Sequence, residues 1–195
     1  YKTENYGRNW KKIVDGIDND HFTRVVRADP LQEGLLFAGT ESGMYISYDD
    51  GQSWDSFQLN LPVVPVTDLT IKNNDLIVAT QGRSFWIFDH LHILRSLDKK
   101  MSGEDITLFK PADPYRIGGR QGGSLFSGEN PLPGAVSYFY LPDDPGEGDD
   151  IHLDIIDAKG DVVRSYHHNT EGLDLGPHTI YGKLNIDKGM NIFSW

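Results

Sequence analysis

The chain contains no cysteine, which excludes disulfide bonds and any metal site built from thiolates. It has no cluster of lysine or arginine, and its formal net charge of −11 makes it acidic. Because proteins that bind nucleic acid normally present a basic face, we expect no nucleic-acid partner. It also lacks a run of about 18 apolar residues, so we expect no membrane-spanning helix. With 38% hydrophobic residues, the chain can still build a core.

Negative charge is densest at residues 143–150, which read Asp-Asp-Pro-Gly-Glu-Gly-Asp-Asp. A calcium loop of the EF-hand type would need regularly spaced oxygen ligands and a closing glutamate, and this segment has neither. Proline, glycine and aspartate favour turns. We therefore predict a solvated loop here, and we predict neither a metal nor a cofactor for the chain.

The most informative stretch is 47–54, which has the form Ser-x-Asp-x-Gly-x-Ser-Trp between two short strand-like runs. This arrangement predicts a β-hairpin with a tight turn. Its defining residues are Ser47, Asp49, Gly51 and Trp54. A variant opens the chain, and the two tryptophans stand 44 positions apart; its equivalent residues are Thr3, Asn5, Gly7 and Trp10.

Each residue type in this motif has a physical reason to be there. Asp49 can accept hydrogen bonds from amides of its own turn, and Asn5 can replace it. Gly51 supplies a positive φ angle without a steric penalty. The Ser47 hydroxyl can satisfy local backbone groups. Trp54 starts the next strand, and we expect its ring to be buried. The motif therefore predicts a structural turn and not a catalytic carboxylate.

Strand-like segments recur around the motif with a regular period. Strands are predicted at residues 22–27, 35–40, 44–48 and 54–58, and again at 66–71, 76–80, 85–88 and 106–110. Residues 89–97 predict a short amphipathic helix capped by Asp89. A four-stranded unit that recurs every 40 to 45 residues is typical of a β-propeller blade. Because two blades cannot close a ring, we expect the last blades of a larger propeller.

The sequence changes character after residue 110. Residues 111–133 are rich in glycine and proline and predict a linker. Residues 134–195 predict further strands, including a hairpin with its turn at 158–161, and favour an immunoglobulin-like antiparallel β-sandwich. The expected organisation is therefore all-β, with a partial propeller at 1–110, the linker, and a sandwich module at 134–195.

The motif at 47–54 resembles the Asp-box, or bacterial neuraminidase repeat (BNR), of sialidase, xyloglucanase and sortilin-type propellers. In those families the box is structural and lies away from the active-site face. Segments 27–30, 37–45 and 76–87 also look like the final blades of bacterial secreted proteins known as sortilin-like or BNR-repeat glycosyl hydrolases. The resemblance implies a secreted, periplasmic or cell-surface protein. Gln81 stands where that family usually has a histidine, so no role of that histidine carries over.

The resemblance implies a parent protein that is glycoside-hydrolase-like or binds glycans. A hydrolase needs two carboxylates that flank the scissile bond. In the related xyloglucanases these come from earlier blades, so no catalytic residue is assigned here and the chain alone is not expected to be catalytic. The alternatives are a sortilin-like propeller that binds proteins or peptides, and a purely structural module that caps the propeller.

Arg83 and Trp86 are the candidate binding residues. An arginine beside aromatic residues suits contact with a carbohydrate or a carboxylate. The alternative interpretation is that Arg83 braces the blade by bonding backbone carbonyls or Asp89. Unpaired strand edges of a partial propeller are also expected to favour self-association.

Several histidines and aromatic residues invite other interpretations. His90 and His92 are expected to point apart on the predicted helix and not to share a metal. The pair His167–His168 is expected to face solvent at a strand end. A glycan platform on the surface would need outward-facing aromatic residues, and alternate aromatics in a strand are more often core; the candidates are Tyr138, Tyr140 and Trp195.

Overall fold

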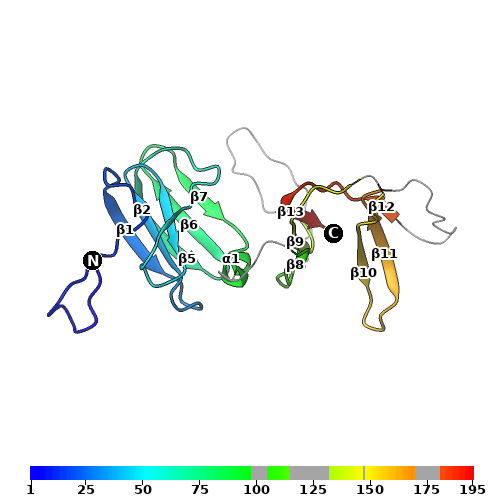
Figure 1. Ribbon diagram of the computed structural model, residues 1–195, viewed down its shortest axis with the longest axis horizontal. Helices are drawn as coiled ribbons and strands as arrows, with labels where there is room; N and C mark the ends of the chain where they lie inside the picture. Colours follow the sequence, from blue (N-terminus) through cyan, green and yellow to red (C-terminus); the bar gives the residue numbers. More distant parts are fainter. Residues whose placement is uncertain (98–104, 115–131, 147, 170–180) are drawn as a thin grey trace. The chain divides into compact units, whose positions relative to one another are not determined.

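The computed structural model describes residues 1–97, 105–114, 132–146, 148–169 and 181–195. They belong to two compact units, Tyr1–Lys100 and Met101–Trp195 (Figure 1). The expected all-β class is confirmed, because nearly all regular structure consists of strands in several sheets that are mainly antiparallel. Within the described ranges, the one helix is α1 (His92–Ser96), and no helix is long and apolar enough to cross a membrane.

The first unit begins with a four-stranded antiparallel sheet in the order β1-β2-β3-β4. Its strands are β1 (Thr23–Ala28), β2 (Leu36–Thr40), β3 (Met44–Ser47) and β4 (Asp55–Ser56). Strands β2 and β3 are buried along nearly their whole length. They can be apolar on both faces because a second sheet covers one face and the segment around Ile17 packs on the other.

The second sheet of this unit has the order β5-β6-β7. Its strands are β5 (Val66–Lys72), β6 (Asp75–Thr80) and β7 (Phe85–Phe88). Each sheet has a register shift at the start of its first strand, which leaves Arg24 in β1 and Thr67 in β5 without a partner in the strand register. A β-bulge at the same place in both sheets marks them as copies of one structural unit.

A backbone hydrogen bond recurs at the same place in the two sheets. The Glu41 amide, after β2, donates to the Phe22 carbonyl, before β1, over 3.0 Å. The Gln81 amide, after β6, donates to the Pro65 carbonyl, before β5, over 2.9 Å. The internal repeat predicted from the sequence is therefore present in the hydrogen bonding as well as in the order of strands.

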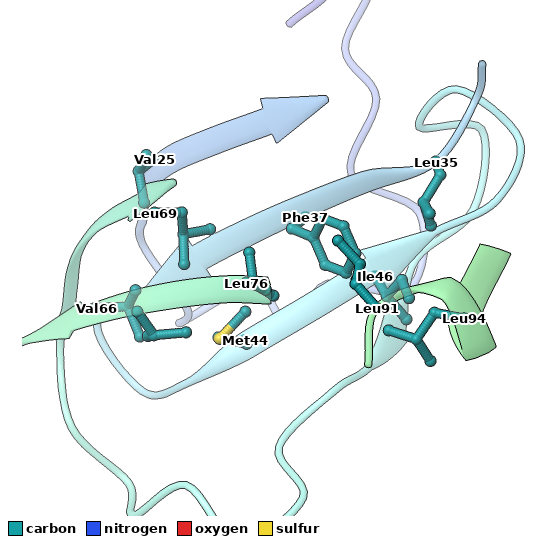
Figure 2. Packing of buried hydrophobic residues seen from close by; sticks show 11 residues of the cluster. Val25, Leu35, Phe37, Met44, Ile46, Val66, Leu69, Leu76, Leu91 and Leu94 are labelled. Atoms are coloured by element: carbon teal, nitrogen blue, oxygen red, sulfur yellow. The ribbon is translucent and has the colours of Figure 1, made fainter. Parts of the chain in front are cut away.

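The main core lies between these two sheets. The cluster labelled in Figure 2 contains Phe37 and Ile46 of the first sheet together with Leu69 and Leu76 of the second. Phe37 and Leu76 are completely shielded from solvent. Burying a side chain of this size stabilises the fold by about 1.5–3 kcal/mol relative to leaving it exposed. Leu91, just before α1, closes one end of the core.

Two expectations for residues 89–110 were wrong. The helix begins after Leu91, with no side-chain cap, because the positive φ angle of His90 (62°) separates Asp89 from it. The strand expected at 106–110 does not complete the second sheet. Instead β8 (Thr107–Leu108) pairs with β9 in the second unit, where Phe109 is buried. These residues belong to the second compact unit, Met101–Trp195.

The described residues of the second unit form two three-stranded sheets. The antiparallel sheet β13-β9-β8 includes β9 (Val136–Leu141) and β13 (Gly189–Ser194). The other sheet consists of β10 (His152–Ile156), β11 (Val162–His167) and β12 (Tyr181–Lys183). Strands β11 and β12 are parallel, which the sequence did not predict. Most of the predicted linker, residues 115–131, lies outside the described residues.

Both sheets of the second unit contribute to a smaller core. Phe139 and Leu141 of β9 are buried with Leu184 and Ile186, which follow β12. Side chains from β10, β11 and β13 pack against this cluster. One face of β10 therefore packs on this core, and the polar residues of that strand lie on the opposite face.

Candidate functional site

The turn at 47–54 is held by its own side chains. The Ser47 hydroxyl donates to Asp49 Oδ1 over 2.8 Å and accepts from the Gly51 amide over 2.9 Å. Asp49 also accepts from the Ser53 amide (2.9 Å) and the Ser53 hydroxyl (2.6 Å). Asp50 and Gly51 have φ angles of 62° and 83°, in the left-handed region. The Asp49 carboxylate is therefore used inside its own turn.

The turn at 3–10 forms equivalents of these bonds, except for the one from the Ser53 hydroxyl, because Asn9 stands at that position. The Gly7 amide donates to Thr3 Oγ1 over 2.9 Å, and the Asn9 amide donates to Asn5 Oδ1 over 2.8 Å. Tyr6 and Gly7 have φ angles of 56° and 83°, nearly those of the second turn. The Lys2 ammonium group forms an ion pair with the Asp50 carboxylate, so the two turns are also in contact. An asparagine can therefore take the place of the aspartate here.

The two tryptophans of these turns differ in burial. The Trp54 ring is 4% exposed, and its Nε1 donates to the Ile13 carbonyl over 3.1 Å. Trp10 is 60% exposed, and its Nε1 donates to Gly7 of its own turn. The expected burial of Trp54 is confirmed, whereas Trp10, at the equivalent position, is exposed. The segment that runs from Ile13 to Ile17 covers Trp54, and no described segment covers Trp10 in this way.

Arg83 lies in the exposed turn between β6 and β7, and Trp86 supports that turn from β7. The Trp86 indole packs against the main core while its Nε1 donates to the Arg83 carbonyl over 3.0 Å. Thr80 closes the turn through two hydrogen bonds to the Ser84 carbonyl. Within the described residues, the Arg83 guanidinium forms no hydrogen bond or ion pair, so the expected brace to Asp89 is not made.

His90 and His92 are neighbours, although the sequence predicted that they would point apart. Their ring centroids are 5.7 Å apart and the rings are nearly perpendicular. Burial lowers the pKa of His92, and the positive charges of His90 and Arg95 lower it further. These effects favour the neutral form of His92. Among the described residues, no third metal-ligating side chain joins this pair.

Tyr138 and Tyr140 are half-buried on one face of β9, while Phe139 and Leu141 occupy the core on the other. The strand alternation therefore places the tyrosines outside the core, contrary to the preferred expectation. They lie beside Ile192 and Met190 of β13, and Trp195 is 51% exposed. This face therefore presents aromatic and apolar side chains outside the small core.

The second unit also brings together three side chains that sequence reasoning did not connect. Asp150, His152 and His167 offer ligand atoms that all lie within 4.8 Å of one another. His167 was expected to face solvent, but it is only 9% exposed. No metal site was predicted, because the pairing of His152 with His167 depends on a β-bulge between the two strands. That bulge has no clear signature in the sequence.

No family model, curated protein or solved structure matches this chain. A proposal for its function therefore rests on the arrangement of its own residues.

Proposed function

We propose that the first unit consists of two blades of an Asp-box β-propeller, and that the chain is the C-terminal part of a secreted glycan-binding or glycoside-hydrolase-like protein. The observation that carries this proposal is the pair of turns at Thr3 and Ser47, which form the same hydrogen bonds 44 residues apart. The repeated bulge in β1 and β5 supports it. In this proposal the boxes are structural, and catalysis belongs to other blades.

The outer face of the second sheet supports a further neighbouring blade. Trp86 and Phe88 of β7 pack on the core, whereas the alternate residues Phe85 and Ile87 are 73% and 58% exposed. Ile77 of β6 pairs with Ile87 and extends this apolar face. Each blade of a propeller buries both of its faces against neighbours. In this proposal a further blade of the same propeller packs against this face.

The Arg83 turn is the proposed contact with carbohydrate. The guanidinium group carries five donors in a planar fork, which suits sugar hydroxyl and carboxylate oxygens. The Trp86 indole fixes the backbone beneath it, so less conformational entropy is lost when a ligand binds. The exposed ring of Phe85, two residues along the chain, adds an apolar surface on which a sugar ring can pack.

Binding of the purified chain to panels of immobilised glycans and peptides tests this proposal. We expect binding to at least one glycan and a loss of about tenfold or more in Arg83→Ala, because hydrogen bonds from a charged donor contribute about 1.5–3 kcal/mol. Arg24→Ala is the matched control, since Arg24 is also exposed but pairs with Glu41. Failure to bind any glycan, or equal binding by Arg83→Ala, contradicts the proposed contact.

A sortilin-like propeller that binds peptides is the second candidate. The observation in its favour is that β7 is an edge strand of its sheet in the described structure. An edge strand can accept an extended peptide through backbone hydrogen bonds, with pockets for alternate side chains giving specificity. Binding of peptides without glycans would support this candidate, and binding of neither would leave the purely structural module.

A further inference from the structure

We propose that Asp150, His152 and His167 form a binding site for a divalent transition-metal ion of the zinc type, on the hairpin of β10 and β11. The two histidines belong to the paired strands β10 and β11, Asp150 lies just before β10, and the ligand atoms of all three lie within 4.8 Å of one another. This site is independent of the Asp-box turns and of the Arg83 turn, which belong to the first unit.

The strand register places the two histidines directly opposite each other. His152 of β10 pairs with His167 of β11, and their ring centroids are 5.4 Å apart. The His168 amide donates to the Ile151 carbonyl over 2.9 Å, so the neighbouring pair is hydrogen-bonded. In an antiparallel ladder the next pair is then a non-hydrogen-bonded one, whose side chains lie closer together. This is the pair in which two imidazoles can share one ion.

The third ligand, Asp150, lies two residues before His152, the first residue of β10. This spacing in an extended segment directs both side chains to one face, so Asp150 lies beside His152. The Asp150 carboxylate is 3.6 Å from His167 Nδ1 and 4.0 Å from His152 Nδ1. The apolar residues Ile151 and Leu153 alternate with them and pack on the small core. The hydrophobic pattern of β10 therefore fixes the polar residues on the opposite face.

The burial of His167 without a hydrogen-bond partner for its Nδ1 among the described residues points to a ligand. His167 is 9% exposed, and its Nδ1 is buried without a hydrogen-bond partner in the described structure. A buried imidazole nitrogen without a partner is costly, typically by about 1–3 kcal/mol. The Asp150 oxygen at 3.6 Å is too distant for a good hydrogen bond. A metal ion between this nitrogen, the carboxylate and His152 would satisfy all three groups.

A second carboxylate is placed to orient His152. Asp154 Oδ2 lies 3.6 Å from His152 Nε2, on the side away from the nitrogen nearest Asp150. The Ser165 hydroxyl donates to the other oxygen of Asp154. Metal-ligating histidines usually direct their second ring nitrogen at a carboxylate, which fixes the ring and makes the ligand more basic. Asp154 would act as such a positioning residue.

The ligand set and spacing favour zinc over calcium or magnesium. Imidazole nitrogens suit zinc and its neighbours in the transition series, whereas calcium and magnesium prefer oxygen ligands. Zinc–nitrogen bonds of about 2.0–2.1 Å require tetrahedral ligand atoms to be roughly 3.4 Å apart. The observed 3.6 and 4.0 Å are close to this, so small side-chain rotations would close the site. Water would fill the fourth position.

Isothermal titration calorimetry of the full chain with zinc chloride, after removal of metals by a chelator, tests the proposal. We expect one zinc ion per chain, with no comparable binding of calcium or magnesium chloride. His152→Asn should weaken zinc binding at least tenfold. This variant is chosen because the His152 side chain is 46% exposed and its loss should not disturb folding. Asp154→Asn should weaken binding by a smaller factor.

His92→Gln is the matched control, because it removes a histidine in the first unit that has no third ligand nearby in the described part of the chain. It should leave zinc binding unchanged. Zinc should also raise the melting temperature of the wild type and of His92→Gln, but not that of His152→Asn. Equal zinc binding by wild type and His152→Asn, absence of binding up to millimolar zinc, or preference for calcium would each overturn the site.

Discussion

Arg95 of α1 donates three hydrogen bonds of 2.9–3.1 Å to the carboxylate of Asp29, 66 residues earlier in the chain. The Asp29 side chain is fully buried and that of Arg95 is 11% exposed. Arg95 also donates to Asn74 Oδ1, in the turn between β5 and β6, over 2.7 Å. One guanidinium group therefore ties the helix to loops of both sheets, and it accounts for the position of a helix that is too short to be stable alone.

Replacement of Arg95 tests how much this contact contributes to stability. Arg95→Ala leaves a buried carboxylate without its main partner, and we expect a loss of about 3 kcal/mol in the unfolding free energy of the first unit. Arg24→Ala, which breaks the exposed pair with Glu41, should cost less than about 1 kcal/mol. Tryptophan fluorescence during denaturation reports mainly on this unit, because three of the four tryptophans, Trp10, Trp54 and Trp86, belong to it and only Trp195 lies in the second unit. Equal losses in the two variants would contradict the prediction.

The folded state should lose stability at acid pH as Asp29 becomes protonated. Burial alone would raise its pKa, but hydrogen bonds from Arg95 and from the amides of Leu31 and Gln32 outweigh this and hold the pKa below its usual value of 3.8. A carboxyl group with a lowered pKa in the folded state stabilises above its unfolded pKa, and the contribution is lost as the pH falls through the folded pKa.

The comparison of wild type with Asp29→Asn isolates this effect. The difference in unfolding free energy should be constant above about pH 5 and should shrink as the pH falls below about 4, where Asp29 takes up a proton. Denaturant titrations of both proteins between pH 7 and pH 2.5 give the difference. A gap that is unchanged down to the lowest pH would show that Asp29 does not titrate with folding.

Gly51 and Gly82 form a matched pair, because their φ angles are 83° and 80°. A Cβ at Gly51 would lie 2.6 Å from Ile13 Cδ1, whereas at Gly82 it would meet nothing within 4 Å. Gly82→Ala should cost about 1 kcal/mol from backbone strain alone. Gly51→Ala should cost about 3 kcal/mol, since it adds overpacking against Ile13. Denaturant unfolding that ranks them equally would show that Ile13 moves aside freely.

The two box turns should respond differently to the same kind of change. Asp49→Ala removes the acceptor for the Ser53 amide and hydroxyl, and we expect a loss of about 1–2 kcal/mol. Asp49→Asn keeps one acceptor oxygen, as Asn5 does in the first turn, and should cost less. Asn5→Ala should cost least, because water can reach the exposed Asn9 amide. Melting curves of the three variants check this order, and a larger loss for Asn5→Ala would refute it.

Local rules determined much of the first unit from the sequence. The motif residues from Ser47 to Trp54 carry their own hydrogen-bond partners within a few positions, so the turn could be predicted without knowledge of its surroundings. The strand-like segments likewise indicated the seven strands β1 to β7, with ends shifted by at most two residues. These features depend on short-range sterics and hydrogen bonding.

Only the tertiary structure decided contacts between distant segments. Nothing local distinguishes Trp10 from Trp54, and their burial differs because the segment from Ile13 covers one ring and not the other. The partner of β8 was likewise decided by the open edge of β9, because an edge strand accepts any neighbour that brings complementary apolar residues.

The proposed metal site depends both on the local sequence pattern and on the tertiary structure. The alternation in β10 determined that His152 would face away from the core. Whether His167 joins it depends on a bulge: Ile155 pairs with Arg164, but Ile156 pairs with Val162. Without that extra residue His152 would face Tyr166, and His167 would lie on the other side of the sheet. A one-residue shift in register, set by packing of the whole unit, decided which side chains meet.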